Sequence, residues 1–522
     1  MASGWSYTLW RYTSSRRRPL RPAQATSHRG PPQAPRRRIV APKISSPTTS
    51  VSCLASEVMV YTRRLSRRIT SLTAVQALLF LSVWFAYGLT INSGNLTAFG
   101  LQQAGVEAYV ERHHFYLEGS RVELLKVQPV VDAFLYNDHI YPAKQPGQFM
   151  AGAVAYAPLH LLGLSYSNHY LLTAALVTFL TASLLVAVSA LAVFRCVLLL
   201  QHSNQLFWPI TVAVVYAFAT TIFPYSGIAW HDSLATSYLT LSFYVFLESA
   251  RTGSERRHRT LMVLGGLFLG LTITTSMLPF LLVVVLSVYY LSSQPLRVFT
   301  FFVVGFVIGL LPLLLYNQIC FGNPFLLPNV AGDYRDTFFH FSAANFFQKL
   351  RFYVHMLTIY VPVFWAGAVG FALFPRWLRR EQIAILLLLL ASFVYILNIE
   401  ATGTCQYGPR YLLPAMPFAC LGLVGFGFLA PKWRRIIVPA VVLVALVSFA
   451  INFIGALHGS MLCDFPQFAA DLYLSQMLNG QLRAYPLAPW LLGPFIISIG
   501  FLVWYLVVAH RGALVQGGQP GG

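Results

Sequence analysis

Long apolar runs recur along this 522-residue chain from about residue 71 onward. A run of about 20 apolar residues is long enough to cross the hydrocarbon core of a bilayer as an α-helix. Charged residues make up only 10% of the chain, whereas an ordinary soluble domain has about 25%. So little charge cannot cover the surface of a soluble protein of this length. The sequence therefore predicts an all-α polytopic membrane protein.

The apolar runs predict about 12 transmembrane helices and a long first outer loop. The predicted spans are 71–92, 169–198, 206–224, 232–250, 260–273, 276–292, 297–316, 352–373, 382–398, 409–430, 436–457 and 488–510. The larger outer loops are expected at about 93–148, 317–351, 399–408 and 458–487.

Basic residues give this topology a direction, because Lys and Arg concentrate on the cytoplasmic side of membrane proteins. The clusters Arg63–Arg68, Arg251–Arg259, Arg376–Arg380 and Lys432–Arg435 all fall on one side if every predicted span crosses. Both chain ends are then inside. The apolar segment 148–164 would move the later clusters to the other side if it crossed, so we expect a surface or re-entrant helix there.

The N-terminal segment differs in composition from the rest of the chain. Residues 1–68 hold 14 of the 36 basic residues and a single acid. Residues 1–58, rich in Arg, Ser and Pro, predict a disordered basic tail. Either this tail contacts anionic membrane lipids, or the start is over-extended and Met59 is the true first residue. Residues 59–512 form the predicted membrane domain, and 513–522 a flexible tail; no nucleic-acid module is recognisable.

Twelve of the sixteen acidic residues fall in the predicted outer loops or at their edges. Most of them are expected to be solvated loop charges. One or two acids in an outward-facing cleft would suit a general base or a metal ligand. The chain carries no nucleotide-binding fingerprint such as a Walker loop.

Several motifs occur in order along the outer segments. They are Gly105-Val106-Glu107-Ala108-Tyr109, then Tyr141-Pro142-Ala143-Lys144-Gln145-Pro146-Gly147, then His231-Asp232, then Phe321-Gly322-Asn323-Pro324-Phe325, and finally Gln406-Tyr407-Gly408-Pro409-Arg410-Tyr411-Leu412-Leu413-Pro414. Together they resemble the GT-C superfamily of membrane glycosyltransferases. The likeness is greatest to the bacterial branch related to protein O-mannosyltransferases and lipid A aminoarabinose transferases.

The resemblance implies a GT-C-like first outer loop with short surface helices and a polyprenyl-phosphate sugar donor. The acceptor is a lipid, glycan or protein hydroxyl or amine, which attacks the sugar carbon bonded to the lipid phosphate. It implies an integral protein of a bacterial plasma membrane and cell envelope, with its active site on the extracytoplasmic side. A positioned carboxylate is needed to deprotonate the acceptor.

Glu107 is the first candidate for this base, and Asp132 is the reserve. The resemblance calls for two acids before the tyrosine, but Val106 stands where the first is expected. An inactive protein of the same fold therefore remains an alternative. A 12-span secondary transporter is a second alternative, although transporters of that size usually show repeated halves and charges within their spans.

The remaining candidate residues are expected either to bind the phosphate or a metal ion, or to line the site of the sugar. Arg410 is expected to stabilise the departing phosphate, because guanidinium forks match phosphate oxygens. Lys144 and His231 are further phosphate candidates. Asp232 is either a helix N-cap that gains from the helix dipole, an acceptor-site group, or a ligand of a divalent metal ion. Substrate-lining roles are expected for Tyr109, Tyr407, Tyr411 and Gly408.

Overall fold

The computed structural model describes residues 72–120, 133–201, 205–292, 296–333, 343–401, 403, 406–459 and 469–517. The chain divides into two units, Met1–Ser66 and Arg67–Gly522, and all the described residues belong to the second. The predicted tail 1–58 and the reserve base Asp132 lie outside the described residues.

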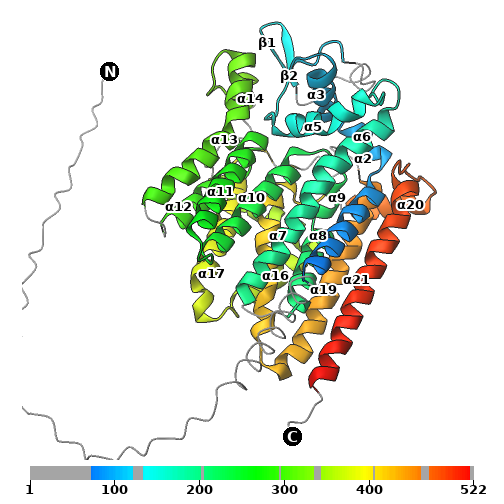
Figure 1. Ribbon diagram of the computed structural model, residues 1–522. Coiled ribbons are helices and arrows are strands. Elements are labelled where there is room, and N and C mark those ends of the chain that lie inside the picture. Colours follow the sequence, from blue (N-terminus) through cyan, green and yellow to red (C-terminus); the bar gives the residue numbers. More distant parts are fainter. Residues whose placement is uncertain are drawn as a thin grey trace, which may run out of the picture. The chain divides into compact units, whose positions relative to one another are not determined.

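The second unit is built almost entirely of helices, as Figure 1 shows. Among the described residues, seven helices are long and apolar enough to cross a membrane. They are Leu72–Thr90, Tyr170–Gln201, Val298–Phe321, Arg376–Leu397, Arg410–Phe428, Pro431–His458 and Ala488–Val508. The prediction of an all-α polytopic membrane protein is confirmed.

The other predicted spans are also helical but depart from simple crossings. Asn345–Tyr360 and Val363–Phe371 meet at 106° and make an eighth span if they count as one. The remaining four predicted spans correspond to α8 (Phe207–Phe218), α10 (His231–Ser249), α11 (Glu255–Thr275) and α12 (Phe280–Leu291). These four are shorter or more polar than a typical span, so seven or eight spans among the described residues meet the length and composition of a membrane crossing.

Helix α10 is the polar exception among the central helices. Fifteen of its 19 residues are buried. Several of its hydroxyls donate to carbonyls one turn earlier on the same helix: Thr236 Oγ1 donates to the Asp232 carbonyl at 2.7 Å, and Ser237 Oγ donates to the Ser233 carbonyl at 2.9 Å. Ser and Thr can be buried in this way without leaving an unpaired polar group.

Facing glycines bring α11 against α13 (Leu296–Phe321). A Cβ added at Gly266 would lie 2.1 Å from the Phe302 carbonyl oxygen, and one at Gly305 would lie 1.9 Å from the Val263 carbonyl oxygen. Each glycine begins a Gly-xxx-Gly pattern on its helix. Small residues at this spacing let the backbones of membrane helices approach closely.

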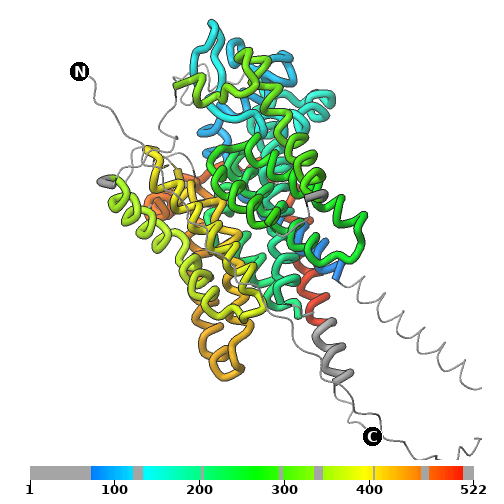
Figure 2. Tube along the Cα trace, turned by 90° about the vertical axis from the view of Figure 1, so that its left-hand side faces the viewer, coloured from blue at the N-terminus to red at the C-terminus, as the bar shows by residue number. Residues whose placement is uncertain are grey.

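The first outer loop forms a layer at one end of the long helices, as the ribbon and the tube view show (Figures 1 and 2). It contains α2 (Ser93–Ala98), α3 (Gly100–Glu111) and a hairpin of β1 (Ala133–Tyr136) with β2 (His139–Pro142), followed by α5 (Gly147–Leu161). The strands pair antiparallel with Ala133 opposite Pro142. The helix predicted over 148–164 is α5, whose 15 residues are too few for a full span.

The remaining elements complete the bundle and its edges. They are α6 (Tyr170–Thr178), the π-helix η1 (Phe179–Ser183), α7 (Leu184–Gln201), α9 (Ile222–Ser226), α14 (Pro328–Ala331), α15 (Ala343–Tyr360), α16 (Val363–Phe371), η3 (Arg376–Leu378), α17 (Arg379–Leu397), η4 (Arg410–Ala415), α18 (Met416–Leu421), η5 (Gly422–Phe428), α19 (Pro431–His458), α20 (Ala469–Leu478) and α21 (Ala488–Gly517). Helix α21 continues beyond residue 512, where the sequence predicts a flexible tail.

Candidate functional site

A cavity of about 50 Å³ collects four of the charged or titratable candidates. Its polar lining residues come from six separate segments of the chain and are Lys144, Gln145, His231, Asp232, Ser276, Asn329, Tyr395, Arg410 and Tyr411. We call it the charged cavity. A water molecule needs about 10–15 Å³ by the same measure, so the charged cavity has room for a small polar group.

Lys144 reaches the cavity because the turn after it packs tightly on the end of α11. A Cβ added at Gly147 would lie 2.8 Å from the Cα atom of Thr275 and 2.9 Å from the Thr274 carbonyl oxygen. Only glycine permits this approach. The contact holds the Lys144–Gly147 turn beside Ser276, which caps the C-terminal end of α11.

Asp232 and His231 begin α10 at the wall of the cavity, and both are buried. The Asp232 carboxylate accepts a hydrogen bond from Trp230 Nε1 at 3.0 Å and another from Ser276 Oγ at 2.9 Å. His231 Nε2 lies 3.3 Å from Asp232 Oδ1. The carboxylate is thus oriented by three neighbours, of which Trp230 and His231 directly precede it in the sequence.

Arg410 reaches the cavity through a tight turn. Gly408 has φ +64°, a left-handed conformation that favours glycine, and Pro409 then starts η4 at Arg410. The Arg410 guanidinium lies between two rings, 5.3 Å from the Trp230 centroid and 4.6 Å from the Tyr411 centroid. Aromatic faces attract a guanidinium and limit its orientations.

The side chains of the charged cavity are suited to binding an anion. Two permanent cations, Lys144 and Arg410, line it beside one carboxylate, Asp232. Charge-assisted hydrogen bonds from Arg and Lys are the usual means of binding phosphate or carboxylate. Low-dielectric walls strengthen such contacts relative to water.

The charged cavity and the basic clusters lie at opposite ends of the same helices. Helix α10 begins at the cavity with His231 and ends at Ser249, just before Arg251. Helix α17 runs the other way, from Arg379 to the cavity residue Tyr395. Each helix has 19 residues, a length of about 28 Å, so the cavity lies across the bundle from the basic face.

Glu107, the first candidate for the base, is not among the residues that line the charged cavity. Its carboxylate is fully buried and accepts from Ser120 Oγ at 2.8 Å and from Arg112 Nη2 at 3.1 Å. The preceding Val106 is also fully buried and packs on α5, where a Cβ at Gly152 would lie 2.4 Å from it. In the first outer loop, Glu107 of this motif therefore forms a buried ion pair with Arg112, and Val106 packs beside it.

The aromatic candidates separate into three places. Tyr411 lines the charged cavity. Tyr407 lines a second, smaller cavity and donates a hydrogen bond to the Ile451 carbonyl at 2.5 Å. Tyr109 is 39% exposed and stacks on Phe115 at 5.0 Å. Gly408 lines neither cavity and serves the turn before Arg410.

Sequence reasoning missed several lining residues of the charged cavity. Gln145 donates to Asn329 Oδ1 at 3.0 Å and joins the first outer loop to α14. Trp230 is not among the lining residues but contacts both Arg410 and Asp232, and it could have been noticed as the neighbour of the His231-Asp232 pair. Asn329 and Ser276 carried no signal, because only the tertiary fold brings them near Lys144.

The role of Asp232 as a ligand of a divalent metal ion stays a prediction. Within the described ranges, no three His, Cys, Asp or Glu side chains form a group that could hold a metal ion. Asp232 and His231 are the two residues of these types that line the charged cavity, and both carboxylate oxygens of Asp232 already accept hydrogen bonds.

An apolar groove of about 470 Å³ opens between α8 and α19. Its lining includes Phe207, Val214, Phe218, Leu446 and Phe449. Phe449 is six residues from Gly455 on α19, a rise of about 9 Å, and Gly455 lines the smaller cavity with Tyr407. Such a groove suits an apolar chain.

No protein-family model matches the sequence, and no curated protein matches it. The chain is similar to the solved structure of ArnT from Cupriavidus metallidurans bound to undecaprenyl phosphate, with 16% identity and a TM-score of 0.47. The match covers 84% of this chain and 76% of that one. ArnT is a member of the GT-C superfamily, which the motifs of this chain resemble.

The chain is also similar to an Archaeoglobus fulgidus oligosaccharyltransferase in complex with Zn and sulfate, with 13% identity and a TM-score of 0.47. That match covers 76% of this chain and 57% of the oligosaccharyltransferase. The archaeal AglB in complex with an inhibitory peptide and a dolichol-phosphate gives 11% identity, a TM-score of 0.45, and coverage of 78% and 60%. At these identities and TM-scores the likeness assigns neither an activity nor a substrate to this chain.

Proposed function

We propose that this chain is a membrane glycosyltransferase that moves a sugar from a polyprenyl-phosphate donor to an acceptor at the outer membrane surface. The observation that carries the proposal is the convergence of Lys144 and Arg410 on one cavity. These residues are 266 positions apart in the sequence. Each of them comes from a motif that resembles the GT-C superfamily.

In the proposed reaction, the acceptor oxygen or nitrogen forms a bond to the sugar carbon while the bond to the lipid phosphate breaks. The electron pair of the broken bond stays on the phosphate, which leaves as an anion. Arg410 and Lys144 stabilise the charge that develops there. The apolar groove between α8 and α19 is a candidate site for the polyprenyl chain.

Asp232 is the carboxylate that we propose for proton removal from the acceptor. It is the one Asp or Glu among the described residues that line the charged cavity. Its two oxygens accept from Trp230 and Ser276, but an ionised carboxylate has about four acceptor positions. One of them can take the acceptor proton, whereas Glu107 is held in its ion pair away from this cavity.

Binding of a bare polyprenyl phosphate to the purified full-length protein tests the phosphate site directly. We expect Arg410→Ala and Lys144→Ala each to raise the Kd about tenfold, because a charge-assisted hydrogen bond contributes about 1.5–3 kcal/mol. Arg434→Ala is the matched control, since Arg434 is exposed near the start of α19. Unchanged affinity in both cavity variants would show that the phosphate binds elsewhere.

Turnover of a labelled polyprenyl-phosphate sugar tests the transfer step. Asp232→Asn should retain phosphate binding but lose sugar transfer, because an amide cannot take the proton. The opposite result would return the role of base to Glu107. In that case Asp232→Asn would keep full sugar transfer, and Glu107→Gln would lose sugar transfer while its thermal stability stayed normal.

A second candidate function is a lipid-phosphate-binding protein of the same fold without turnover. Val106 and the ion pair of Glu107 favour it, because the motif from which a base was expected is used for packing. This candidate predicts normal binding of polyprenyl phosphate and no transfer to any lipid, glycan or peptide acceptor.

A further inference from the structure

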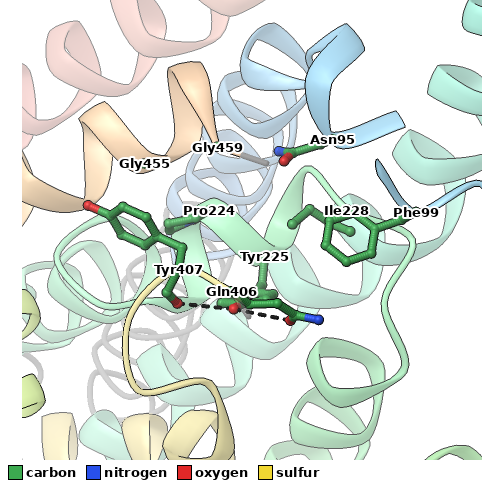
Figure 3. Close-up of a pocket in the computed structure, with 9 residues that line it drawn as sticks. All are labelled: Asn95, Phe99, Pro224, Tyr225, Ile228, Gln406, Tyr407, Gly455 and Gly459. Atoms are coloured by element: carbon green, nitrogen blue, oxygen red, sulfur yellow. Dashed lines mark hydrogen bonds between the residues drawn. The ribbon is translucent and has the colours of Figure 1, made fainter. Parts of the chain in front are cut away.

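A second cavity lies beside the charged cavity and has a different chemical character. Figure 3 shows its lining side chains, among them Asn95, Phe99, Tyr225, Gln406 and Tyr407. Among the described residues that line it there is no Asp, Glu, Lys, Arg or His, so we call it the neutral cavity. Its volume of about 10 Å³ matches the space that a single water molecule requires, about 10–15 Å³.

Asn95 is the residue that gives the neutral cavity its chemistry. Its side chain is 1% exposed, and neither Nδ2 nor Oδ1 has a hydrogen-bond partner among the described residues. Burying an amide without partners is unfavourable, and most buried polar atoms in native proteins are paired. An amide left in this state therefore points to a group that occupies the cavity.

The surroundings of Asn95 leave room for that group. A Cβ added at Gly459 would lie 3.4 Å from Asn95 Oδ1, so a larger side chain at this position would begin to fill the space. Asn95 also starts an Asn-Leu-Thr sequence that could accept a glycan. Its burial keeps the amide nitrogen away from a modifying enzyme in the folded protein.

Further polar groups face the same space. The Tyr225 hydroxyl donates to the Tyr407 carbonyl at 3.0 Å and lies 3.3 Å from Gln406 Oε1, as the dashed lines in Figure 3 mark. A hydroxyl that donates still has acceptor capacity, and the Gln406 amide adds two N–H donors. A ligand that both donates and accepts hydrogen bonds suits this set.

The neutral cavity adjoins the charged cavity through two aromatic rings. Phe99 lines the neutral cavity, and its ring meets that of Trp230 edge-on at 4.9 Å. Trp230 in turn lies against Arg410. The segment Gln406–Tyr411 contributes residues to both cavities, so a ligand with a phosphate and a hydroxyl group could address both.

We propose that the neutral cavity binds one hydroxyl oxygen, with the Asn95 amide as both donor and acceptor. In the resting protein this oxygen belongs to a water molecule. When a lipid-phosphate sugar occupies the charged cavity, a sugar hydroxyl replaces the water. The second statement rests on the proposed function, whereas the first does not.

A high-resolution structure of the ligand-free full-length protein tests the water. The expected result is a density peak within about 2.7–3.2 Å of the Asn95 amide atoms. The same peak should be missing in Asn95→Leu, which keeps the size of the side chain but removes both polar atoms. An empty neutral cavity in the wild type would overturn the proposal.

Binding of two lipids tests the sugar hydroxyl: a bare undecaprenyl phosphate and an undecaprenyl-phosphate hexose. The wild type should bind the hexose form about tenfold more tightly, and Asn95→Leu should lose this preference while keeping its affinity for the bare phosphate. Asn168→Leu, the same change at an exposed asparagine, should behave as the wild type.

The outcomes separate this inference from the proposed function. Equal affinities of the wild type for the two lipids, or an unchanged preference in Asn95→Leu, would restrict the neutral cavity to water. Failure of the wild type to bind the bare phosphate would refute the proposed function, and the density beside Asn95 would still decide whether the cavity holds water.

Discussion

Two groups of buried charge in this protein are organised in different ways. In the first outer loop, Glu107 pairs with Arg112 and Ser120, which follow it within 13 residues. In the charged cavity, Lys144, Asp232 and Arg410 come from distant segments. The pairing residues of the first group lie within a short stretch of chain. Among the described residues of the second group, two cations and one carboxylate surround a space.

The difference indicates different roles. A carboxylate that is fully buried and matched by a neighbouring guanidinium stabilises a loop, because removing either partner leaves an uncompensated charge. A set of charges around a cavity is arranged for something that enters it. Glu107 and Asp232 are both buried acids, and Asp232 lines such a space.

The largest expected effect comes from breaking the ion pair of the outer loop. Glu107→Ala should lower the free energy of unfolding by about 3 kcal/mol, near the lower end for a buried pair, because Arg112 is 16% exposed. Thermal unfolding of the purified protein in detergent measures this loss, while the affinity for polyprenyl phosphate should stay unchanged.

The control for this prediction is an exposed pair. Glu255 and Arg259 form an i,i+4 ion pair whose side chains are 71% and 51% exposed, and such pairs contribute little. Glu255→Ala should therefore leave the unfolding temperature nearly unchanged. Equal losses in Glu107→Ala and Glu255→Ala would contradict the assignment of a structural role to Glu107.

A smaller effect is expected from loosening the charged cavity without removing a charge. Trp230→Phe keeps an aromatic ring near Arg410 but removes the N–H group that donates to Asp232. We expect about fivefold weaker binding of polyprenyl phosphate, equivalent to about 1 kcal/mol, because Asp232 and the ring are then less well oriented.

The matched control is Trp208→Phe, since Trp208 is a buried tryptophan that does not line the charged cavity. It should bind the phosphate like the wild type. If the two tryptophan variants bound equally well, the contact between Trp230 and Asp232 would have no part in positioning the site.

The smallest effect concerns the pH dependence of the outer loop. Burial, and then the nearby Arg112 guanidinium, lower the pKa of His114 below its ordinary value of 6.5. The unfolded chain therefore binds the proton first, and stability should fall as the pH drops below 6.5 toward the folded pKa. Above 6.5 this contribution is fully present.

His114→Phe preserves the ring that stacks on Tyr116 at 3.5 Å but removes the titration. Unfolding temperatures between pH 5 and 7.5 should vary less in this variant than in the wild type. His169→Phe, at an exposed histidine, should keep the wild-type slope, and an unchanged slope in His114→Phe would exclude His114 as its source.

The sequence was most informative where the physical cause is local. Apolar runs predict helices in a bilayer because each helix satisfies its own backbone hydrogen bonds. All twelve predicted spans coincide with helices. The number of true crossings is less predictable, because α10 and α11 are sheltered by neighbouring helices and tolerate polar residues that a lone span would not.

The candidate site was predictable in part, residue by residue. Lys144, His231, Asp232 and Arg410 each stood out from a short motif, and all four line one cavity. Glu107 stood out in the same way, yet it lies in an ion pair. The local sequence shows that a side chain is charged or titratable and therefore suited to catalysis or binding. It does not show which other residues form ion pairs or hydrogen bonds with that side chain.

The sequence by itself determined the helical membrane character and singled out four charged or titratable residues, Lys144, His231, Asp232 and Arg410. The tertiary structure decided that these four meet, that Glu107 is matched by Arg112, and that Asn95 faces a neutral cavity. The reason is that burial and pairing depend on contacts between distant segments. Gly147 on Thr275 and Phe99 on Trp230 are two such contacts.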